Sequence, residues 1–387
     1  MEEVVVLIVG AGPSGLAVSN CLSHLSIPNI VLEREDCSAS LWRKRSYDRL
    51  TLHLAKEFSS LPCMPHASSS STFMPRKCFI EYIDSYISKF GIEPIYSRSV
   101  ESGLYVENEK KWRVEARNTL TQEKEVYVAQ FLVVATGENS KGFIPELPGL
   151  DGFKGKIIHS SEYKSGKDYE NKNVLVVGCG NSGMEISYDL SNFGAHTSIV
   201  IRNPFHVLTR EMVYIGMLLC KYVPMTIADS VVTFLGKLWY GDLTSFGIHR
   251  PAKGPFHLKL ASGKTPVIDI GTIKKIESGD IKVLPKIVRI NGNNVVFENS
   301  VVKRFDEIIF ATGYKSTANY WLKDYKYIMN KDGMPKRPYP HHWKGENGIY
   351  CVGFSKQGLA GITRDSVAIA NDIDEVLHGM EGKIKVT

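Results

Sequence analysis

The chain opens with a strand–helix–strand pattern. The solid apolar run Val4–Val9 predicts a strand of a parallel sheet, because such strands are buried on both faces. A glycine-rich turn follows, and the sequence after it predicts a helix from Ser14 to about Leu25. The short run Ile30–Leu32 predicts the next strand, which ends at Glu33. Together these segments predict one βαβ unit.

The same pattern returns later in the chain. Val174–Val177 predicts a buried strand, a glycine-rich turn and a helix follow it, and a strand over Thr197–Ile201 ends at Arg202. The two glycine-rich turns begin at Gly10 and Gly178, which are 168 residues apart. That distance is far longer than a solenoid repeat, so it indicates that a whole βαβ architecture is present twice.

Two further apolar strands end in the same way. Phe131–Ala135 continues into Thr136–Gly137, and Ile308–Ala311 continues into Thr312–Gly313. A small residue followed by glycine at a strand end allows the chain to cross close to a bound cofactor. A purely structural role for each ending is an equal alternative.

Elsewhere the pattern is mixed. Apolar residues at helical spacing predict a helix over Phe79–Phe90. Alternation of apolar and polar residues predicts antiparallel strands at Trp112–Ala116 and around Val126–Val128. A run of four serines within residues 66–72 predicts a surface loop.

The most apolar segment is Met212–Trp239, which Lys221, Asp229 and Lys237 interrupt. No stretch approaches the ~18 uncharged apolar residues of a membrane span, so we expect no transmembrane segment. The favoured interpretation of this segment is one or two buried amphipathic helices. The alternative is a mobile apolar lid, or a peripheral contact with a membrane surface through residues 212–239.

Composition narrows the class of protein. A chain of 387 residues predicts two or three domains, and its 43% hydrophobic and 23% charged residues are typical of globular proteins. The net charge of +6 is spread along the chain, whereas a nucleic-acid-binding protein more often carries a dense basic stripe. We therefore expect anionic small-molecule ligands and no nucleic-acid partner.

The cysteines and the N-terminus indicate the compartment. The seven cysteines contain no Cys-x-x-Cys pair, which argues against a dithiol redox centre and against the usual zinc spacing. An odd cysteine count, together with acidic residues where a secretory signal would be basic, favours a reducing, cytoplasmic location. No metal-binding cluster, carboxylate pair or Ser-His-Asp order stands out, so we expect no metal.

The first glycine-rich turn reads Gly10-Ala11-Gly12-Pro13-Ser14-Gly15. In a dinucleotide-binding turn, the first glycine permits the tight turn, the second lets a pyrophosphate approach the backbone, and the third allows close helix–strand packing. The N–H groups at the helix start then face the phosphates. Glu33 follows Gly10 by 23 residues, where a carboxylate accepts the ribose hydroxyls of an adenosine. The alternatives are a simple glycine-rich turn and a solvated acid at Glu33.

The second turn reads Gly178-Cys179-Gly180-Asn181-Ser182-Gly183, and here the strand ends at a cation. Arg202 follows Gly178 by 24 residues. A carboxylate would repel a 2′-phosphate, whereas the planar fork of arginine binds it, so this motif predicts an NADPH site. Asn181 and Ser182 stand at the helix start, where phosphate contacts form. The alternative is that Arg202 is only a surface charge.

Two dinucleotide sites in one chain predict a tightly held flavin and a nicotinamide donor. We assign the first motif and both Ala-Thr-Gly endings to FAD, and the second motif to NADPH. The segment from Phe153 to Tyr163 has the pattern FxGxxxHxxxY, whose histidine is His159. We favour a hydrogen-bonded histidine in a turn over a catalytic base at this position.

The combination of these motifs resembles a known family. The two glycine motifs around FxGxxxHxxxY are similar to those of class B flavin-containing monooxygenases. Further stretches resemble the plant YUCCA flavin monooxygenases, and the resemblance runs from about residue 4 to 377. These stretches are Tyr47–Leu54, Ala135–Asn139, Gly178–Glu185, Arg250-Pro251 with Gly254-Pro255, Gly263–Pro266, Ser278–Lys282 and Phe310–Lys315.

The resemblance implies an α/β fold with two Rossmann-like domains. Residues 1–164 and 303–387 would form a discontinuous FAD domain, with an NADPH domain of residues 165–302 inserted. The implied reaction uses NADPH and O2 to convert indole-3-pyruvate, a small 2-oxo acid, to indole-3-acetate, the hormone auxin. The implied location is cytoplasmic, with association with the endoplasmic reticulum surface as an option.

The resemblance also implies site residues. Leu41, Trp42 and His53 would lie near the flavin, and Asn139 would face its reactive edge. His53 and Asn139 are the candidate catalytic residues, although the flavin itself carries the chemistry. The alternatives are that Trp42 is ordinary core and that His53 is an ordinary buried histidine.

The chain departs from the family pattern at two places that bear on substrate choice. It has Leu54-Ala55-Lys56 where Leu-Pro-Lys is common, and Leu208-Thr209 where Leu-Pro is usual. One alternative function is therefore an N- or S-oxygenating monooxygenase acting on soft nucleophiles. Another is a plain NADPH oxidase or a non-catalytic regulator, which the intact glycines at both motifs argue against.

Overall fold

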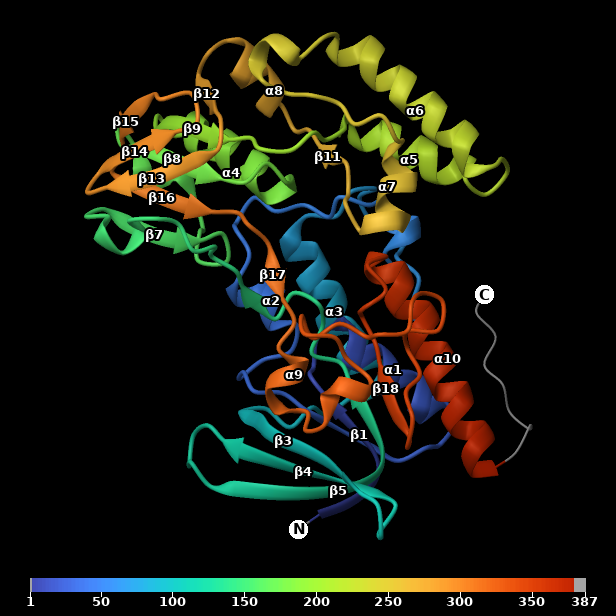
Figure 1. The fold of residues 1–387 in the computed structure, drawn as a ribbon. Helices are drawn as coiled ribbons and strands as arrows, with labels where there is room; N and C mark the ends of the chain where they lie inside the picture. The colour runs from blue at the N-terminus through green and yellow to red at the C-terminus, as the bar shows by residue number, and fades with distance from the viewer. Residues whose placement is uncertain (1, 379–387) are drawn as a thin grey trace. The chain divides into compact units, whose positions relative to one another are not determined.

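The computed structural model describes residues 2–378, which form two compact units (Figure 1). Unit 1 contains residues 2–44, 55–141 and 314–378. Unit 2 contains Arg45–Leu54 and Gly142–Gly313. The chain therefore leaves unit 1 twice, once for a segment of ten residues and once for the whole of the larger insertion.

The core of unit 1 is a six-stranded mixed sheet in the order β2-β1-β5-β4-β3, with β18 also pairing with β5. β1 is parallel to both β2 and β5, whereas β4 is antiparallel to its neighbours. The parallel part confirms the first predicted βαβ unit. The strands are β1 (Glu2–Val9), β2 (Asn29–Leu32), β3 (Arg98–Val106), β4 (Lys111–Asn118), β5 (Lys124–Val134) and β18 (Ile349–Cys351).

One strand prediction was wrong in detail. The regions Val126–Val128 and Phe131–Ala135, predicted as separate strands, belong to the single strand β5. Along one edge, the first half of β5 pairs with β4 and its last residues pair with β18. The neighbour changes midway, so one part alternates in polarity like an antiparallel strand and the other is a continuous apolar run.

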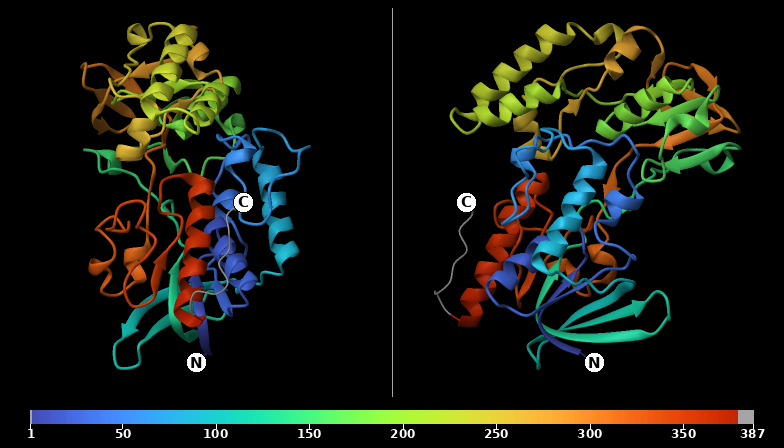
Figure 2. Two further views of the ribbon diagram at one scale, coloured as in Figure 1. Left: turned by 90° about the vertical axis from the view of Figure 1, so that its right-hand side faces the viewer. Right: turned by 180° about the vertical axis from the view of Figure 1, so that it is seen from behind.

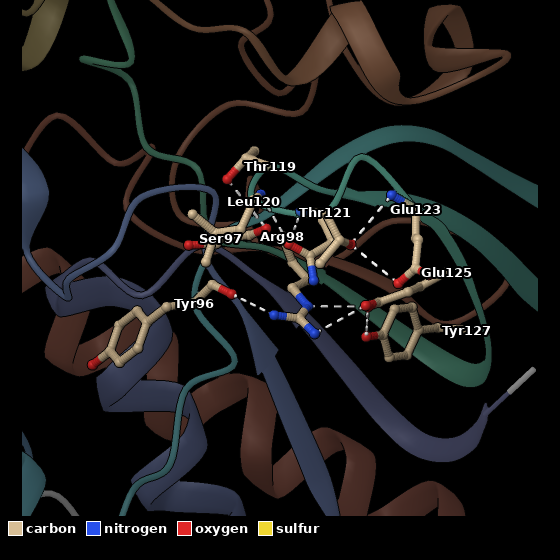
Figure 3. Close-up of polar contacts among 10 residues, drawn as sticks. Tyr96, Ser97, Arg98, Thr119, Leu120, Thr121, Glu123, Glu125 and Tyr127 are labelled. Atoms are coloured by element: carbon tan, nitrogen blue, oxygen red, sulfur yellow. Dashed lines mark hydrogen bonds and ion pairs between the residues drawn. The ribbon is translucent and has the colours of Figure 1, made fainter.

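A polar network joins the antiparallel strands (Figure 3). The Arg98 guanidinium on β3 binds the two carboxylate oxygens of Glu125 on β5, at 2.9 and 3.1 Å. The Tyr127 hydroxyl donates to the same carboxylate at 2.7 Å, and Arg98 also donates to the Tyr96 carbonyl at 3.0 Å. The hydrogen bonds from Arg98 lower the pKa of Glu125, so the pair stays ionised at neutral pH. This pair ties β3 to β5 across β4.

Helix α1 lies against α3 and α10 in unit 1, as Figures 1 and 2 show. The predicted helices over Ser14–Leu25 and Phe79–Phe90 are confirmed as α1 and α3. The predicted serine loop over residues 66–72 contains no helix or strand. The helical elements are α1 (Pro13–His24), α2 (Ser40–Lys44), α3 (Arg76–Phe90), α9 (Ala318–Trp321), α10 (Gly358–His378), and the 3-10 turns Lys56–Phe58 and Tyr325–Tyr327.

Unit 2 is built on a five-stranded, fully parallel sheet in the order β12-β9-β8-β16-β7. β8, the following helix and β9 confirm the second predicted βαβ unit, and β16 confirms the strand predicted at Ile308–Ala311. The elements are β7 (Lys156–His159), β8 (Asn173–Val177), α4 (Asn181–Asn192), β9 (His196–Val200), α8 (Thr272–Glu277), β12 (Ile281–Leu284) and β16 (Glu307–Phe310).

The sheet explains where unit 2 begins and ends. β16 pairs with β8 on one side and with β7 on the other, so the residues around both strands belong to this unit. The unit boundaries at 141/142 and 313/314 therefore differ from the predicted domain boundaries at 164/165 and 302/303. The assignment of one cofactor to each domain stays a prediction at this point.

The segment Met212–Trp239 forms two helices, α5 (Arg210–Leu219) and α6 (Met225–Tyr240), which confirms the predicted helices. The prediction that they are buried was wrong for one apolar face, because Ile227, Phe234 and Leu238 are exposed. They pack together, and α6 also packs on α7 (Pro255–Ser262). The side chain of Thr209, which replaces the usual proline, accepts a hydrogen bond from the Met212 N–H at 3.2 Å and caps α5. Among residues 2–378, no helix is both long and apolar enough to cross a membrane.

A buried carboxylate joins α6 to α7. Asp229 accepts hydrogen bonds from the Phe256 and His257 N–H groups, at 2.7 and 3.0 Å, in the first turn of α7. A Cβ atom at Gly254 would lie 2.3 Å from Asp229 Cγ, which explains why glycine precedes Pro255 here.

The remaining elements are β6 (Lys141–Gly142), β10 (Val207–Leu208), β11 (Val267–Ile268), β13 (Ile287–Asn291), β14 (Asn294–Phe297), β15 (Val302–Arg304), β17 (Tyr314–Lys315) and the 3-10 turns Leu150–Gly152, Gly166–Tyr169 and Thr244–Phe246.

Candidate cofactor sites

The two glycine-rich turns have the same backbone geometry. Gly10 and Gly178 have φ values of +111° and +112°, in the left-handed region that favours glycine. A Cβ atom at Gly10 would lie 2.7 Å from the Ala135 carbonyl oxygen, and one at Gly178 would lie 2.5 Å from that of Ala311. Each turn therefore passes directly beside the end of an Ala-Thr-Gly strand, one in each unit.

The third and second glycines of each turn have opposite surroundings. A Cβ atom at Gly15 or Gly183 would lie 1.9 Å from the carbonyl oxygen of the first glycine, so the helix approaches the strand end closely. Among residues 2–378, no heavy atom beyond the adjoining part of the chain lies within 4 Å of a Cβ added at Gly12 or Gly180. The space beside the second glycine is where a pyrophosphate would approach the backbone, so both turns fit a dinucleotide.

The helix ends complete this fit. α1 and α4 have twelve residues each, and their N-cap residues, Gly12 and Gly180, supply no side-chain hydrogen bond to the first turn. The N–H groups at a helix start are unpaired within the helix and carry partial positive charge. Each helix therefore presents an anion-binding end beside the open space of its glycine turn.

Glu33 lies at the end of β2, beside the first turn, and is buried. Its carboxylate accepts hydrogen bonds from the Ala11 N–H at 2.8 Å and the Glu35 N–H at 3.0 Å. Burial raises the pKa of this carboxyl, while the two backbone donors lower it. Glu33 thus supports the turn directly, and its predicted contact with a ribose hydroxyl stays a prediction.

The strand end in unit 1 offers an unpaired polar atom. Within the described residues, the buried Thr136 Oγ1 has no hydrogen-bond partner. Gly137 has open space at its Cβ position, and Asn139 is exposed. A buried hydroxyl without a partner costs free energy, which a ligand at this strand end would recover. This observation fits a cofactor beside Thr136.

The residues predicted near the flavin differ in their surroundings. Leu41 and Trp42 belong to α2, which follows Ala39, and the Ala39 N–H donates to the Ala11 carbonyl of the first turn at 2.9 Å. The Trp42 ring packs on Phe79 with 4.5 Å between ring centroids. Within unit 1, the first contact joins the segment before α2 to the first turn, and the second packs α2 on α3.

His53 belongs instead to unit 2. Its Nε2 lies 2.6 Å from Oε1 of Glu185 on α4, and Glu185 is only 1% exposed. Burial, followed by the charge of Glu185, raises the pKa of the neighbouring Tyr47 hydroxyl. The sequence interpretation missed Glu185. A glutamate among the buried apolar positions of a predicted helix was the available signal, because such an acid needs a partner.

The second Ala-Thr-Gly ending also lies in unit 2. Thr312 Oγ1 donates to the Phe143 carbonyl, and the Gly313 carbonyl lies 3.0 Å from His159 Nε2. Gly313 leaves open space at its Cβ position. The structure therefore brings Thr312 and Gly313 together with the second glycine turn, and their assignment to FAD stays a prediction.

His159 is buried in a hydrogen-bonded turn. Besides its contact with Gly313, its Nδ1 lies 3.0 Å from Ser161 Oγ, and a Cβ atom at Gly142 would lie 2.3 Å from the same nitrogen. Burial lowers the pKa of the imidazole, so the ring is neutral at pH 7. These contacts agree with the favoured interpretation of the FxGxxxHxxxY histidine as a structural residue.

Some side chains of the second turn already have contacts within the protein. Asn181 Oδ1 accepts the Ile268 N–H at 2.7 Å and so connects α4 to β11. Burial raises the pKa of the Cys179 thiol. Arg202 is exposed shortly after β9 and lines an open pocket of about 780 Å³ together with Asn203 and His249. A guanidinium there is available to an anionic ligand.

Comparisons with known proteins identify a family and its members that are similar to this chain. The flavin-binding monooxygenase-like family matches residues 3–378. Probable indole-3-pyruvate monooxygenase YUCCA10 of Arabidopsis thaliana is 56% identical over 97% of this chain and 98% of its own. Indole-3-pyruvate monooxygenase YUCCA4 of Oryza sativa is 45% identical over 97% and 88%.

Solved structures show the same fold at low identity. A flavin-containing monooxygenase from Stenotrophomonas maltophilia is 18% identical, with a TM-score of 0.74 over 97% of this chain and 99% of that one. Cyclohexanone monooxygenase from Rhodococcus sp. Phi1, bound to NADP+, is 17% identical, with a TM-score of 0.74 over 97% and 85%.

The glycines give a matched test of the cofactor motifs. Gly12→Ala and Gly180→Ala place a methyl group in open space, so we expect the apoprotein to unfold at the wild-type midpoint. We expect Gly12→Ala to lose FAD on purification, and Gly180→Ala to keep FAD but to bind NADP+ about tenfold or more weakly, a loss of about 1.4 kcal/mol.

The control pair is Gly15→Ala and Gly183→Ala. Their methyl groups would meet a carbonyl oxygen, so we expect a lower unfolding midpoint even without cofactor. Flavin absorbance, calorimetry and denaturant unfolding give the three readouts. Wild-type cofactor binding by Gly12→Ala and Gly180→Ala would contradict the assignment.

Proposed function

Because the chain belongs to the flavin-binding monooxygenase-like family and, within it, to the plant YUCCA group, we propose that it oxidatively decarboxylates indole-3-pyruvate. In the balanced reaction, indole-3-pyruvate, NADPH, O2 and a proton give indole-3-acetate, CO2, NADP+ and water. The observation that carries this proposal is 56% identity to a probable indole-3-pyruvate monooxygenase over nearly the full length of both chains. The product is auxin, so the proposed role is auxin biosynthesis.

The proposal places the FAD pyrophosphate at the first glycine turn, in unit 1, and the NADPH pyrophosphate at the second, in unit 2. FAD, which is reduced by NADPH and reacts with O2, supplies the redox chemistry. Gly12 leaves room for the FAD pyrophosphate in unit 1, and Thr136 lies at the strand end beside the same turn. Gly180 and the start of α4 do the same for the NADPH pyrophosphate in unit 2. The protein residues thus bind and orient the cofactors, which agrees with the absence of a recognisable enzymic nucleophile in the sequence.

The decisive experiment is a product assay with the purified holoenzyme. We expect NADPH- and O2-dependent formation of indole-3-acetate in proportion to the NADPH consumed, measured by mass spectrometry. The Gly12→Ala variant, assayed without added FAD, corrects for breakdown of the keto acid in solution. Efficient sulfoxidation of a thioether without indole-3-acetate would favour the N- or S-oxygenating alternative, and NADPH oxidation without any oxygenated product would favour a plain oxidase.

Arg202 is proposed to select NADPH over NADH. Its exposed guanidinium stands at the end of the second strand of the motif, where Glu33 stands in the first. We expect Arg202→Ala to raise the KM for NADPH about tenfold or more, with little change for NADH, because a charge-assisted pair with the 2′-phosphate is lost. Steady-state kinetics with both nucleotides measure this, with Arg289→Ala as a control at another site of unit 2. An unchanged preference would remove Arg202 from the site.

We also propose a peripheral membrane contact through α6. The apolar residues Ile227, Val231, Phe234 and Leu238 follow one helical stripe, and all are exposed. Phe234 and Leu238 expose 64% and 74% of their surfaces. Tyr222 before the helix and Trp239 near its end are also exposed, and the exposed Lys221 and Lys237 suit anionic headgroups. A cytoplasmic enzyme with this face would associate with a surface such as that of the endoplasmic reticulum.

Vesicle sedimentation tests this contact. We expect the holoenzyme to sediment with phosphatidylcholine vesicles that contain phosphatidylserine, and the double variant Phe234→Ser/Leu238→Ser to sediment several-fold less, because both side chains would no longer enter the interface. Leu120→Ser, in unit 1, is the matched control because Leu120 is 79% exposed. Equal sedimentation of all three proteins, or none by the wild type, would contradict the proposal.

A further inference from the structure

Helix α4 carries two buried carboxylates behind the second glycine turn. Glu185 and Asp189 are four residues apart, so they lie on the same side of the helix, and they are 1% and 7% exposed. A buried carboxylate is costly unless cations or hydrogen-bond donors compensate it. The partners of these two residues therefore show what α4 is packed against.

Each carboxylate has one partner in Arg45–Leu54, which we name the strap. His53 Nε2 lies 2.6 Å from Glu185 Oε1, and Arg49 Nη1 lies 3.5 Å from Asp189 Oδ1. The Arg49 guanidinium also lies 4.6 Å from the centre of the Tyr188 ring. The strap residues are spaced by four, as the acids are, and they meet them in reverse order.

Further contacts of the strap also lie in unit 2. The Asp48 N–H donates to the Lys164 carbonyl at 3.0 Å, and Lys164 Nζ donates to the Ser46 carbonyl at 3.1 Å. Tyr47 is buried in the same apolar cluster as residues of α4, and Leu50 packs against that cluster. The chain on either side of the strap belongs to unit 1, so these ten residues depart from their sequence neighbours to hold α4.

Asp189 additionally fixes the linker that precedes β8. Its Oδ2 accepts hydrogen bonds from the Tyr163 hydroxyl at 2.7 Å and the Gly166 N–H at 2.8 Å. The rear of α4 is thus held at two points, by the strap and by the linker. The N-terminal end of the same helix is the one that would bind the NADPH pyrophosphate.

We propose that the strap positions α4 for binding of the nicotinamide dinucleotide, and that His53 and Arg49 are positioning residues acting through Glu185 and Asp189. This inference rests on the proposed assignment of NADPH to the second motif. It gives His53 a role at α4 in place of the catalytic role that the family resemblance implies. Its contact with Glu185 directs one ring nitrogen to the helix rather than to a substrate.

The test is a double-mutant cycle on the holoenzyme. We expect His53→Ala and Glu185→Ala each to raise the Kd of NADP+ about tenfold, and the double variant to be no worse than the weaker-binding single variant, since both changes remove one shared contact. FAD content should stay at the wild-type level. His196→Ala is the matched control, because His196 is an exposed histidine of the same unit.

Two further readouts separate positioning from a merely structural or a catalytic role. His53→Gln keeps an N–H donor for Glu185, so we expect it to restore NADP+ binding to within about threefold of the wild type. The KM for NADPH should rise in the alanine variants more than kcat falls, because the loss is in binding. Should Glu185→Ala fail to fold, Arg49→Ala and Asp189→Asn probe the second contact in the same way.

Several outcomes would overturn the inference. A wild-type Kd with a lowered kcat in His53→Ala would make His53 a catalytic residue, and additive losses would show that His53 and Glu185 act independently. Wild-type protein that binds no NADP+ would remove the premise. In contrast, wild-type protein that binds NADP+ but forms no indole-3-acetate would overturn only the proposed substrate, because the binding cycle is measured without any keto acid.

Discussion

The close approach of a helix to a strand end, at Gly15 and again at Gly183, is the constraint on which both units depend. At each position an added Cβ would lie 1.9 Å from a backbone carbonyl oxygen, so no side chain fits. This contact places the first turn of α1 or α4 directly beyond the carboxyl end of a buried parallel strand. The neighbouring Gly12 and Gly180 have open space at their Cβ positions.

The same constraint organises the sheets. In each unit the strand beside the glycine turn comes from far along the chain, β5 in unit 1 and β16 in unit 2. The carbonyl oxygens of Ala135 and Ala311 leave no room for a side chain at the first glycine of each turn. Each glycine turn therefore packs directly on an Ala-Thr-Gly strand end that lies far from it in the sequence. The insertion of unit 2 therefore begins before β7 and ends after β16, two strands that pair with each other, rather than at a composition change in the sequence.

The sequence patterns correctly predicted those elements whose structure depends on residues near one another in the chain. The apolar run of β1, the periodicity of α3 and the glycine spacing were enough to predict those elements, because each depends on near neighbours in the chain. The continuity of β5 could not be predicted, since its polarity pattern changes where its neighbour changes from β4 to β18. The contact between His53 and Glu185 joins residues that are 132 positions apart, so no spacing pattern in the sequence could predict it. The location of Thr312 beside the second turn likewise follows from the order of strands in the sheet.

Selectivity between the two motifs has to come from outside the turns. The first glycines share a φ value to within one degree, the third glycines have the same close contact, and the second glycines have the same open space. The backbone of the two turns would therefore offer a pyrophosphate the same environment. The residues after the second strands differ in charge, with the buried Glu33 tied to its turn and the exposed Arg202 beside an open pocket. A carboxylate at that place disfavours a 2′-phosphate and a guanidinium attracts it, so under the proposed assignment this charge reversal would separate a dinucleotide with a 2′-phosphate from one without it.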